Sequence, residues 1–467
     1  MQTSIDWSTS SVLTNLTHLD GRNAKKLLSL RPLFSELAWM KERIFVMGEY
    51  VTALVPFLTG RPLSDAQRKA LQGIAESFST KDARLVGQYE QTTNHDLKAL
   101  ELFYASRFAK LHLTKFTRYI NLGLGSEDIN SIALAAVLQK GRDGEMLSGI
   151  ATVARALGAL AKSQKNTMMV ARTHGQPANV TTLGKEIANS LSRLCDEVEI
   201  LLQTSFTAKC SGEVGSYQAF LGIDPTKDWL TFTDSFIRSL GLRPTHSATQ
   251  IAPYDVLTRF LQSLFRLNAI LLDFVKNMWL YVLLGYFRVK VVEKEVGSAG
   301  MPHKVNPIYF EGAEGGLETA NGVIELLTRK LPINRLQRDF SDSTMRRNIV
   351  LVCAYSVLSY QSIIEGMKRI DVDGEAIATD VDRHGEIWIE LVKSFGLAAG
   401  YESMYDVLKR ETRGREVAQS ELTDLVSRLP FTDTEKKELR KRMFGQNLYL
   451  VKVVDEALAR LDSVFPL

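Results

Sequence analysis

Cysteine, proline and long uncharged apolar runs are all scarce in this chain of 467 residues. The three cysteines, Cys195, Cys210 and Cys353, have no short spacing, which fits neither a disulfide framework nor a zinc site and favours a reducing compartment. The longest apolar stretch, 267–287, contains an aspartate and a lysine near its centre. A charge there makes a membrane span costly, so we expect a buried core helix instead.

A large excess of charge of one sign is also missing. The chain has 57 basic and 53 acidic residues, for a formal net charge of +4, and the two kinds are interspersed. A nucleic-acid-binding protein would gather its basic residues in one stripe, so the mild excess favours anionic small-molecule substrates. The N-terminal MQTSIDWSTSS lacks the basic-then-apolar order of a signal peptide, and we expect a cytoplasmic protein.

Helical spacing dominates what remains. Only 12 prolines occur, and strand-like alternation is rare. Apolar or small residues recur every three or four positions from Leu147 and from Ile187, and the stretches 254–290 and 346–370 also indicate long helices. Several long helices that are dense in apolar positions predict an all-α fold built around a bundle.

We divide the chain into three helical domains. An N-terminal helical domain is expected at 1–120, a central long-helix bundle with a polar loop at 121–370, and a C-terminal helical domain at 371–467. One subunit could not cover every apolar helix face, so we expect subunits to pack helix against helix.

Two polar segments have the composition of helix starts. In Thr92–Asp96 we expect Asn94 to be the cap and Asp96 to lie in the first turn, and at Gly125–Asp128 we expect Ser126 to be the cap. These features have a purely structural explanation. The functional alternative is that free N–H groups at a helix start bind carboxylate or phosphate, which the two acids after Ser126 would oppose.

A third segment, RTHGQPA at 172–178, places His174 between residues typical of a turn. An imidazole in a turn can donate or accept a proton near neutral pH. The alternative is a structural histidine.

A fourth segment, GSAGMPHKVNP at 297–307, contains glycines, prolines and a lysine between two apolar helical stretches. A short polar connector would suffice there. We therefore prefer a flexible lid that closes on a bound anion to a plain surface loop.

A fifth segment, RLQRDFSDSTMRR at 335–347, spaces Arg338, Ser343 and Arg347 five and four residues apart. Such residues on a turn leading into a helix can converge on one anion, and arginine suits bidentate capture of carboxylate or phosphate. A solvated helix end with salt bridges is the alternative.

Together these segments resemble the fumarase/aspartase superfamily, whose signature loop has the form GSSxMPxKxN and reads GSAGMPHKVN here. Within it, the chain resembles the bacterial branch of the adenylosuccinate lyases. The segments TTNHD, SEDIN, RTHGQPA, TLGKEIAN, MPHKVNPIYFE, LPINRLQRDFSDST and TRGR match in type and order. The likeness extends from Asp20 to about Gly414.

The resemblance implies a carbon–nitrogen lyase of the amidine-lyase type that releases fumarate by β-elimination from adenylosuccinate, giving AMP. The related succinyl-carboxamide ribotide of purine synthesis is a second implied substrate. Ser298 would be the general base and His174 the general acid. The other implied catalytic residues are His95, which orients substrate, Lys304, which supports the carbanion, and Glu311, which supports the site from behind.

The resemblance also implies a substrate-binding set. Its members are Arg22, Asn94, Asp96, Ser126, Thr173, Gln250, Met301, Asn306, Arg338, Ser343 and Arg347. The family is a homotetramer in which each site draws segments from three subunits. It uses no metal and no organic cofactor, and neither nucleic acid nor membrane is an implied partner.

Several positions depart from the family pattern. Asn23 replaces a tyrosine, Gly125 replaces a threonine, and Ala299 and Gly300 replace a serine and a threonine beside the proposed base. Glu213 adds a negative charge in a stretch that is rich in asparagine in the family. These changes leave two alternatives open: a fumarate-releasing lyase of a different succinyl-amine, and a silent helical scaffold, which the retained serine–histidine pair disfavours.

Overall fold

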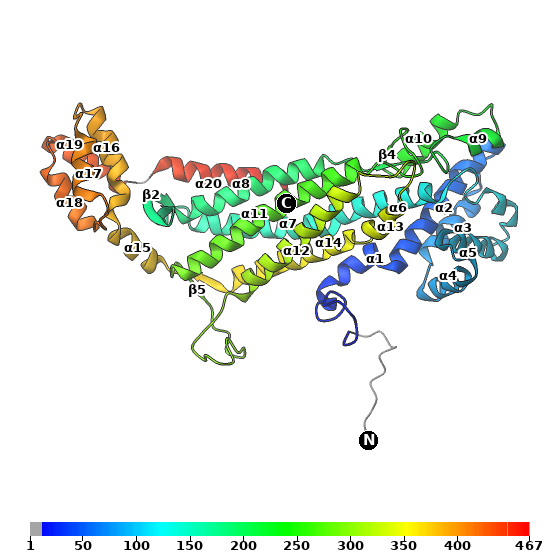
Figure 1. Cartoon of the computed structure of the whole chain (residues 1–467), viewed down its shortest axis with the longest axis horizontal. Coiled ribbons are helices and arrows are strands. Elements are labelled where there is room, and N and C mark those ends of the chain that lie inside the picture. The colour runs from blue at the N-terminus through cyan, green and yellow to red at the C-terminus, as the bar shows by residue number, and fades with distance from the viewer. Residues whose placement is uncertain (1–11, 446, 467) are drawn as a thin grey trace, which may run out of the picture. The chain divides into compact units, whose positions relative to one another are not determined.

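The computed structural model describes residues 12–445 and 447–466. Residues 1–11, on which the expectation about a signal peptide rests, lie outside the described residues. Helices dominate the described chain, and the strands form three sheets of two short strands each (Figure 1). The predicted all-α class is confirmed.

The chain divides into two compact units. Unit 1 comprises Met1–Ser148, Ile200–Phe265 and Thr319–Leu358, and unit 2 comprises Gly149–Glu199, Arg266–Glu318 and Ser359–Leu467. The boundaries fall inside helices α7 (Leu147–Ser163), α8 (Leu183–Leu202), α11 (Asp255–Leu283), α12 (Ile308–Lys330) and α14 (Ile349–Lys368).

Unit 1 contains eleven further α-helices and strands among the described residues. They are α1 (Arg31–Phe34), α2 (Glu36–Thr59), α3 (Asp65–Glu76), α4 (Thr80–Thr93), α5 (Asp96–Lys110), α6 (Ser126–Gly141), β3 (Thr207–Ala208), α9 (Gln218–Ile223), α10 (Trp229–Ser239), β4 (Arg243–Pro244) and the short α13 (Ser341–Arg346). Side-chain caps begin several of these helices: Ser35 accepts the N–H of Ala38, and Ser64 and Ser79 each form a capping box.

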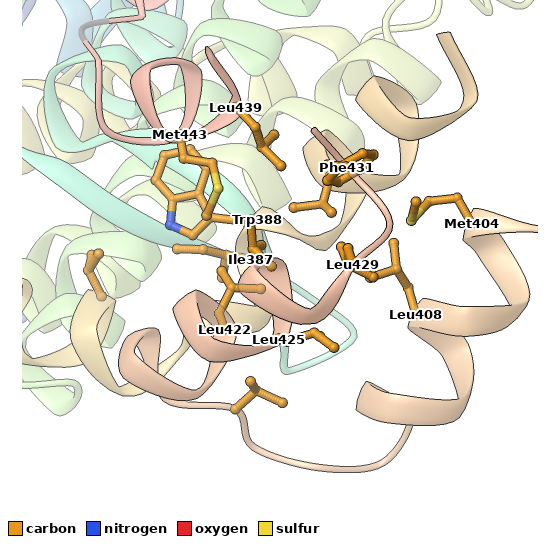
Figure 2. Close-up of a cluster of buried hydrophobic side chains, with 14 of the residues drawn as sticks. Ile387, Trp388, Met404, Leu408, Leu422, Leu425, Leu429, Phe431, Leu439 and Met443 are labelled. Carbon is orange, nitrogen blue, oxygen red and sulfur yellow. The ribbon is translucent and has the colours of Figure 1, made fainter. Parts of the chain in front are cut away.

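Unit 2 contains the remaining strands and α-helices. They are β1 (Met168–Thr173), β2 (Gln176–Thr182), β5 (Phe287–Val289), β6 (Ile370–Val372), α15 (Gly374–Arg383), α16 (Ile389–Ala398), α17 (Met404–Thr412), α18 (Gln419–Arg428), α19 (Asp433–Phe444) and α20 (Leu448–Val464). Helices α16 to α19 gather in one cluster (Figure 1). Buried side chains such as Ile387, Trp388, Leu422 and Leu439 form their common core (Figure 2).

The two longest predicted helices end earlier than expected. Helix α11 stops at Leu283 instead of reaching 290, and α14 stops at Lys368 before strand β6. After α11, Gly285 adopts φ +78°, and the N–H of Tyr286 bonds to the carbonyl of Tyr281 at 2.9 Å. This left-handed glycine termination satisfies the last carbonyls and ends the helix, which apolar periodicity alone does not reveal.

One described helical stretch is long and apolar enough to cross a membrane by length and composition. It is Ser341–Lys368, with a mean hydropathy of 1.4 and 56% of its most apolar window buried. The core helix of a soluble protein passes the same test, so this property alone is weak evidence for a span.

Candidate active site

A cavity of about 670 Å³ in unit 1 gathers residues from five separate parts of the chain. Eight residues of the predicted site line it: Asn94, His95, Asp96, Ser126, Gln250, Arg338, Ser343 and Arg347. Trp39, Asn130, Phe340 and the side chain of Arg346 also line it. A cavity of this size is in the range of small-molecule sites, and its polar groups converge from several elements.

His95 lies at the start of α5, where it replaces the predicted cap. Asn94 has φ +49° and ends α4, so it is not the cap that we predicted. The His95 Nδ1 accepts the N–H of Lys98 at 3.3 Å and is itself the N-cap. In the neutral ring the proton is then on Nε2, which leaves a donor for a ligand.

The first turn of α5 is tied to a buried arginine. Arg43 of α2 is 1% exposed, and its Nη1 donates to Asp96 at 2.6 Å. Burial would raise the pKa of Asp96, but the charge and hydrogen bond of Arg43 outweigh it and lower that pKa. Asp96 is therefore ionised and committed to Arg43, which fixes the position of the neighbouring His95.

Glu127 contacts two arginines of the cavity. Its carboxylate accepts bonds from Arg346 at 2.7 and 3.0 Å and lies 3.3 Å from Arg338. Burial would raise the pKa of Glu127, but the bonds and charge of Arg346 and then the charge of Arg338 lower it below the usual value. Glu127, which we expected to oppose anion binding, is thus already paired with arginines.

Arg347 differs from Arg338 and Arg346, which both lie beside Glu127. It lines the cavity, its side chain is exposed, and no ion pair joins it to an acid in the described part of the chain. Ser343, one helical turn before it, lines the same cavity. A guanidinium and a hydroxyl in this arrangement suit a carboxylate or phosphate group.

The start of α6 is held by a second buried acid. Gly125, not Ser126, is the N-cap, because the carboxylate of Asp128 accepts the N–H of Gly125 at 2.8 Å. Asp128 also pairs with Lys209 at 2.7 Å, both being fully buried, and burial raises the pKa of Asp128. The predicted cap Ser126 is therefore a first-turn residue that faces the cavity.

Two departures from the family pattern touch each other here. A Cβ atom at Gly125 would come within 2.9 Å of the Cα of Glu213. The Glu213 carboxylate accepts a bond from Gln250 Nε2 at 3.2 Å. Because a carboxylate only accepts, this contact turns the Nε2 of Gln250 toward Glu213.

His174 lies at the tip of a β-hairpin in unit 2, on a turn as predicted. Strands β1 and β2 are antiparallel, with Thr173 paired to Gln176, so the turn consists of His174 and Gly175 alone. Their φ values are +55° and +73°. Two positive φ values define a tight hairpin turn whose twist matches its strands, which exposes the imidazole.

The predicted lid is the segment between β5 and α12 in unit 2, which projects from those elements (Figure 1). The Oγ of Ser298 accepts the N–H of Met301 at 3.1 Å, and Asn306 Nδ2 donates to the carbonyl of Gly297 at 3.2 Å. A Cβ at Gly297 would lie 2.4 Å from the carbonyl oxygen of Lys304. The loop therefore folds back on itself, and only glycine permits that approach.

The remaining predicted residues do not line the cavity. Arg22 is an exposed residue of unit 1 that does not line it. Thr173 belongs to the hairpin, Lys304 is exposed in the loop, and Glu311 in the first turn of α12 accepts a bond from Trp279 at 3.1 Å. The seven predicted residues of the hairpin, the loop and α12 all belong to unit 2.

Sequence reasoning missed the paired charges in and around the cavity: Arg43, Glu127 as a partner, Asp342 and Arg346. Tyr254 donates to Asp342 at 2.6 Å, and Asp342 lies 3.1 Å from Arg338. A possible signal was the density of arginines and acids in 335–347, but only the fold shows which acid belongs to which arginine.

No group of three or more His, Cys, Asp or Glu side chains in residues 12–445 and 447–466 is placed to hold a metal ion.

Comparisons with known proteins decide the family. Residues 37–322 match the family described as Lyase, and residues 334–446 match the family described as Adenylosuccinate lyase C-terminal. The chain is 36% identical over 435 residues to the adenylosuccinate lyase of Haemophilus influenzae, covering 92% of this chain and 95% of that protein. The chain belongs to the adenylosuccinate lyase family. The Escherichia coli adenylosuccinate lyase is 34% identical with the same coverage, and the predicted family membership is confirmed.

Two solved structures of lower sequence identity share the fold. The 3-carboxy-cis,cis-muconate lactonizing enzyme of Pseudomonas putida has a TM-score of 0.71 at 18% identity, over 94% of this chain and 97% of that one. A fumarate lyase from Mesorhizobium sp. BNC1 has a TM-score of 0.69 at 18% identity, over 93% and 97%. At such identities the likeness concerns the fold alone.

Proposed function

We propose that this adenylosuccinate lyase family member cleaves adenylosuccinate to AMP and fumarate, and the succinyl-carboxamide ribotide of purine synthesis in the same way. The supporting observation is the cavity that brings His95, Ser343 and Arg347 together with the paired Arg338. A phosphorylated, twice-carboxylated substrate needs such a cationic, donor-rich site.

The elimination removes a weakly acidic proton beside a carboxylate. The Ser298 alkoxide takes this proton, and the bond from the Met301 N–H to Ser298 Oγ supports negative charge on that oxygen. Each unit by which the serine pKa falls requires about 1.4 kcal/mol of differential interaction. Lys304 and Asn306 hold the succinyl carboxylate, and Glu311 supports the site from behind.

The carbon–nitrogen bond then breaks as the nitrogen is protonated. His174 supplies this proton as general acid. Its exposed place at the hairpin tip leaves it accessible to a substrate. His95, Asn94, Asp96, Ser126 and Gln250 orient the substrate, and the remaining members of the predicted contact set are Arg22, Thr173, Met301, Arg338, Ser343 and Arg347.

We further propose a cytoplasmic homotetramer that needs no metal or organic cofactor and binds neither nucleic acid nor membrane. Each active site takes segments from three subunits, and the chain functions as three helical domains, 1–120, 121–370 and 371–467. Ser298 is partly covered and His174 is exposed, which agrees with a site completed by other subunits.

A second candidate is a lyase for a different succinyl-amine. The contact of Gly125 with Glu213, and the bond from Gln250 to Glu213, favour it, because they place a carboxylate beside a residue of the cavity. An anionic substrate group next to Glu213 would be repelled.

An absorbance assay with purified protein and adenylosuccinate tests the proposal. We expect stoichiometric AMP and fumarate. Fumarate release from another succinyl-amine, without turnover of adenylosuccinate, would establish the second candidate instead.

The assigned acid and base are tested by Ser298→Ala and His174→Ala. Each should lower kcat by several orders of magnitude, on the order of the loss seen when an essential acid or base is removed. Circular dichroism and gel filtration should be unchanged, because neither side chain is buried. Near-normal turnover in either variant would refute the role of that residue.

A further inference from the structure

A hydrogen-bonded network lies at the base of the His174 hairpin in unit 2. Arg172 Nη2 donates to both carboxylate oxygens of Asp380, at 2.8 and 2.7 Å, and its Nη1 donates to the Tyr286 hydroxyl at 2.8 Å. The Tyr286 hydroxyl also donates to Asp380. The side chains of Arg172 and Asp380 are each 20% exposed. A bidentate, partly buried pair of this kind fixes orientation as well as distance.

The three side chains come from three different elements. Arg172 belongs to β1, two residues before His174. Tyr286 directly precedes β5, the strand that leads into the Ser298 loop, and its carbonyl accepts the N–H of Asp373 at 2.8 Å. Asp380 is on α15. The network therefore joins the strand that holds the proposed acid to the strand that begins the loop of the proposed base.

The backbone at Arg172 strengthens this connection. The strand register shifts between Ala171 and Arg172, so that Arg172 pairs with Pro177. Such bulges turn a side chain away from the regular pleat. Only Thr173 separates Arg172 from the tight turn. A shift of the Arg172 backbone would therefore move the base of the turn that carries His174.

Apolar packing also supports the His174 hairpin. Val170, two residues before Arg172, belongs to the buried cluster that also contains Val381, the neighbour of Asp380, and Trp388. Burial raises the pKa of Tyr286 to about 12, so its hydroxyl stays protonated and remains a donor at neutral pH. Apolar packing thus supports the hairpin, and the polar contacts of Arg172 set the position of its turn.

We propose that Asp380 is a positioning residue for the lyase reaction: it holds Arg172 and Tyr286 together and thereby fixes the His174 turn within unit 2. This inference rests on the proposed function. Asp380 acts through its two partners, so its loss should affect turnover more than substrate affinity, which the anion-binding residues of the cavity provide.

The test compares Asp380→Asn, Asp380→Glu and Tyr286→Phe with Glu416→Gln as the matched control. Glu416 forms an exposed pair with Arg383 of the same helix α15, with side chains 49% and 65% exposed. Asp380→Asn should lower kcat roughly 10- to 100-fold with KM within about threefold, as expected when a catalytic group is misplaced. Tyr286→Phe should lower kcat less, Asp380→Glu should recover part of the loss, and Glu416→Gln should match the wild type.

Hydrogen exchange provides a readout that does not depend on turnover. In Asp380→Asn, amides of 168–182 should exchange faster while the rest of the chain keeps its protection and the thermal midpoint stays well above the assay temperature. A kcat like that of Glu416→Gln, or a general loss of protection, would overturn the inference.

If Asp380→Asn does not fold, Tyr286→Phe and Asp380→Glu decide by the same criteria. Absence of turnover in the wild type refutes the proposed function instead, and faster exchange confined to the hairpin still identifies the positional link.

Discussion

At the scale of single residues, the cavity is defined by which of its arginines already has a carboxylate. The Glu127 carboxylate forms ion pairs with Arg346 and Arg338, and Asp342 forms a further ion pair with Arg338. Arg347 lies in the same cavity without such a partner in the described residues. The paired arginines hold the wall of the cavity in place. Arg347 is the cation that we expect to bind the anionic group of the substrate.

Replacing Arg347 should therefore weaken substrate binding. In Arg347→Ala we expect KM to rise about 10- to 100-fold, because a charge-assisted hydrogen bond contributes about 1.5–3 kcal/mol. Arg335→Ala is the control, since Arg335 is 86% exposed at its side chain and does not line the cavity. Steady-state kinetics measure both, and an unchanged KM in Arg347→Ala would remove Arg347 from the binding site.

Glu127 should make stability depend on pH in the acid range. Its folded-state pKa is below the usual 4.5, so its contribution is complete above that value and is lost as the pH falls through the folded pKa. Removing one partner of a buried pair costs about 3–5 kcal/mol, so Glu127→Gln should be destabilised near pH 7 and converge with the wild type as the pH falls below the folded-state pKa of Glu127.

Urea unfolding at several pH values measures this difference. Glu456→Gln is the control, because the Glu456 side chain is 65% exposed in a surface pair with Lys452. A difference between Glu127→Gln and the wild type that did not shrink toward low pH would contradict the assigned ion pairs.

At the scale of elements, the hairpin and the loop show how backbone geometry places the reactive side chains. The hairpin turn needs two left-handed residues, His174 and Gly175. The loop needs a glycine where Gly297 meets the carbonyl of Lys304. In both cases the glycine stands next to the residue to which we assign the proton transfer.

The loop glycines provide a matched comparison. Gly297→Ala should lower kcat at least about tenfold, because its Cβ would lie 2.4 Å from the Lys304 oxygen and displace the adjoining Ser298. Gly300→Ala should be tolerated, since no atom lies within 4 Å of the added Cβ. Equal effects of the two substitutions would show that the folded-back loop is not the active form.

At the scale of the whole molecule, the proposed site residues divide between the two units of one chain. The cavity with His95 belongs to unit 1, and the hairpin and the loop belong to unit 2. In the proposed tetramer three subunits meet at each site. Residues from unit 1 of one subunit and from unit 2 of others then form one active site.

Mixed tetramers test this assembly. His174→Ala and Ser298→Ala chains, each inactive alone, should regain up to about a quarter of wild-type activity after being unfolded and refolded together, because some sites combine intact residues from different chains. Gel filtration should show four times the chain mass. If refolded wild type is active but the mixture is not, His174 and Ser298 of one site come from the same subunit.

The sequence by itself determined the class of fold and the segments that bear the chemistry. Helical periodicity and the positions of glycine, proline and histidine depend on neighbouring residues, so they could be read locally. The long helices and the turn at His174 followed from them, and the family membership followed from the resemblance of the motifs. Caps and helix ends were less predictable: His95 took the place of Asn94, and α11 ended at Leu283, two residues before Gly285.

Only the tertiary structure decided which side chains meet. Glu127 and Arg346 are 219 residues apart in sequence, and nothing local pairs them. The same holds for Arg172 with Asp380, which are separated by 208 residues. Such contacts arise because the packing of apolar faces fixes the distances between helices, and the buried charges must then find their partners inside that packing.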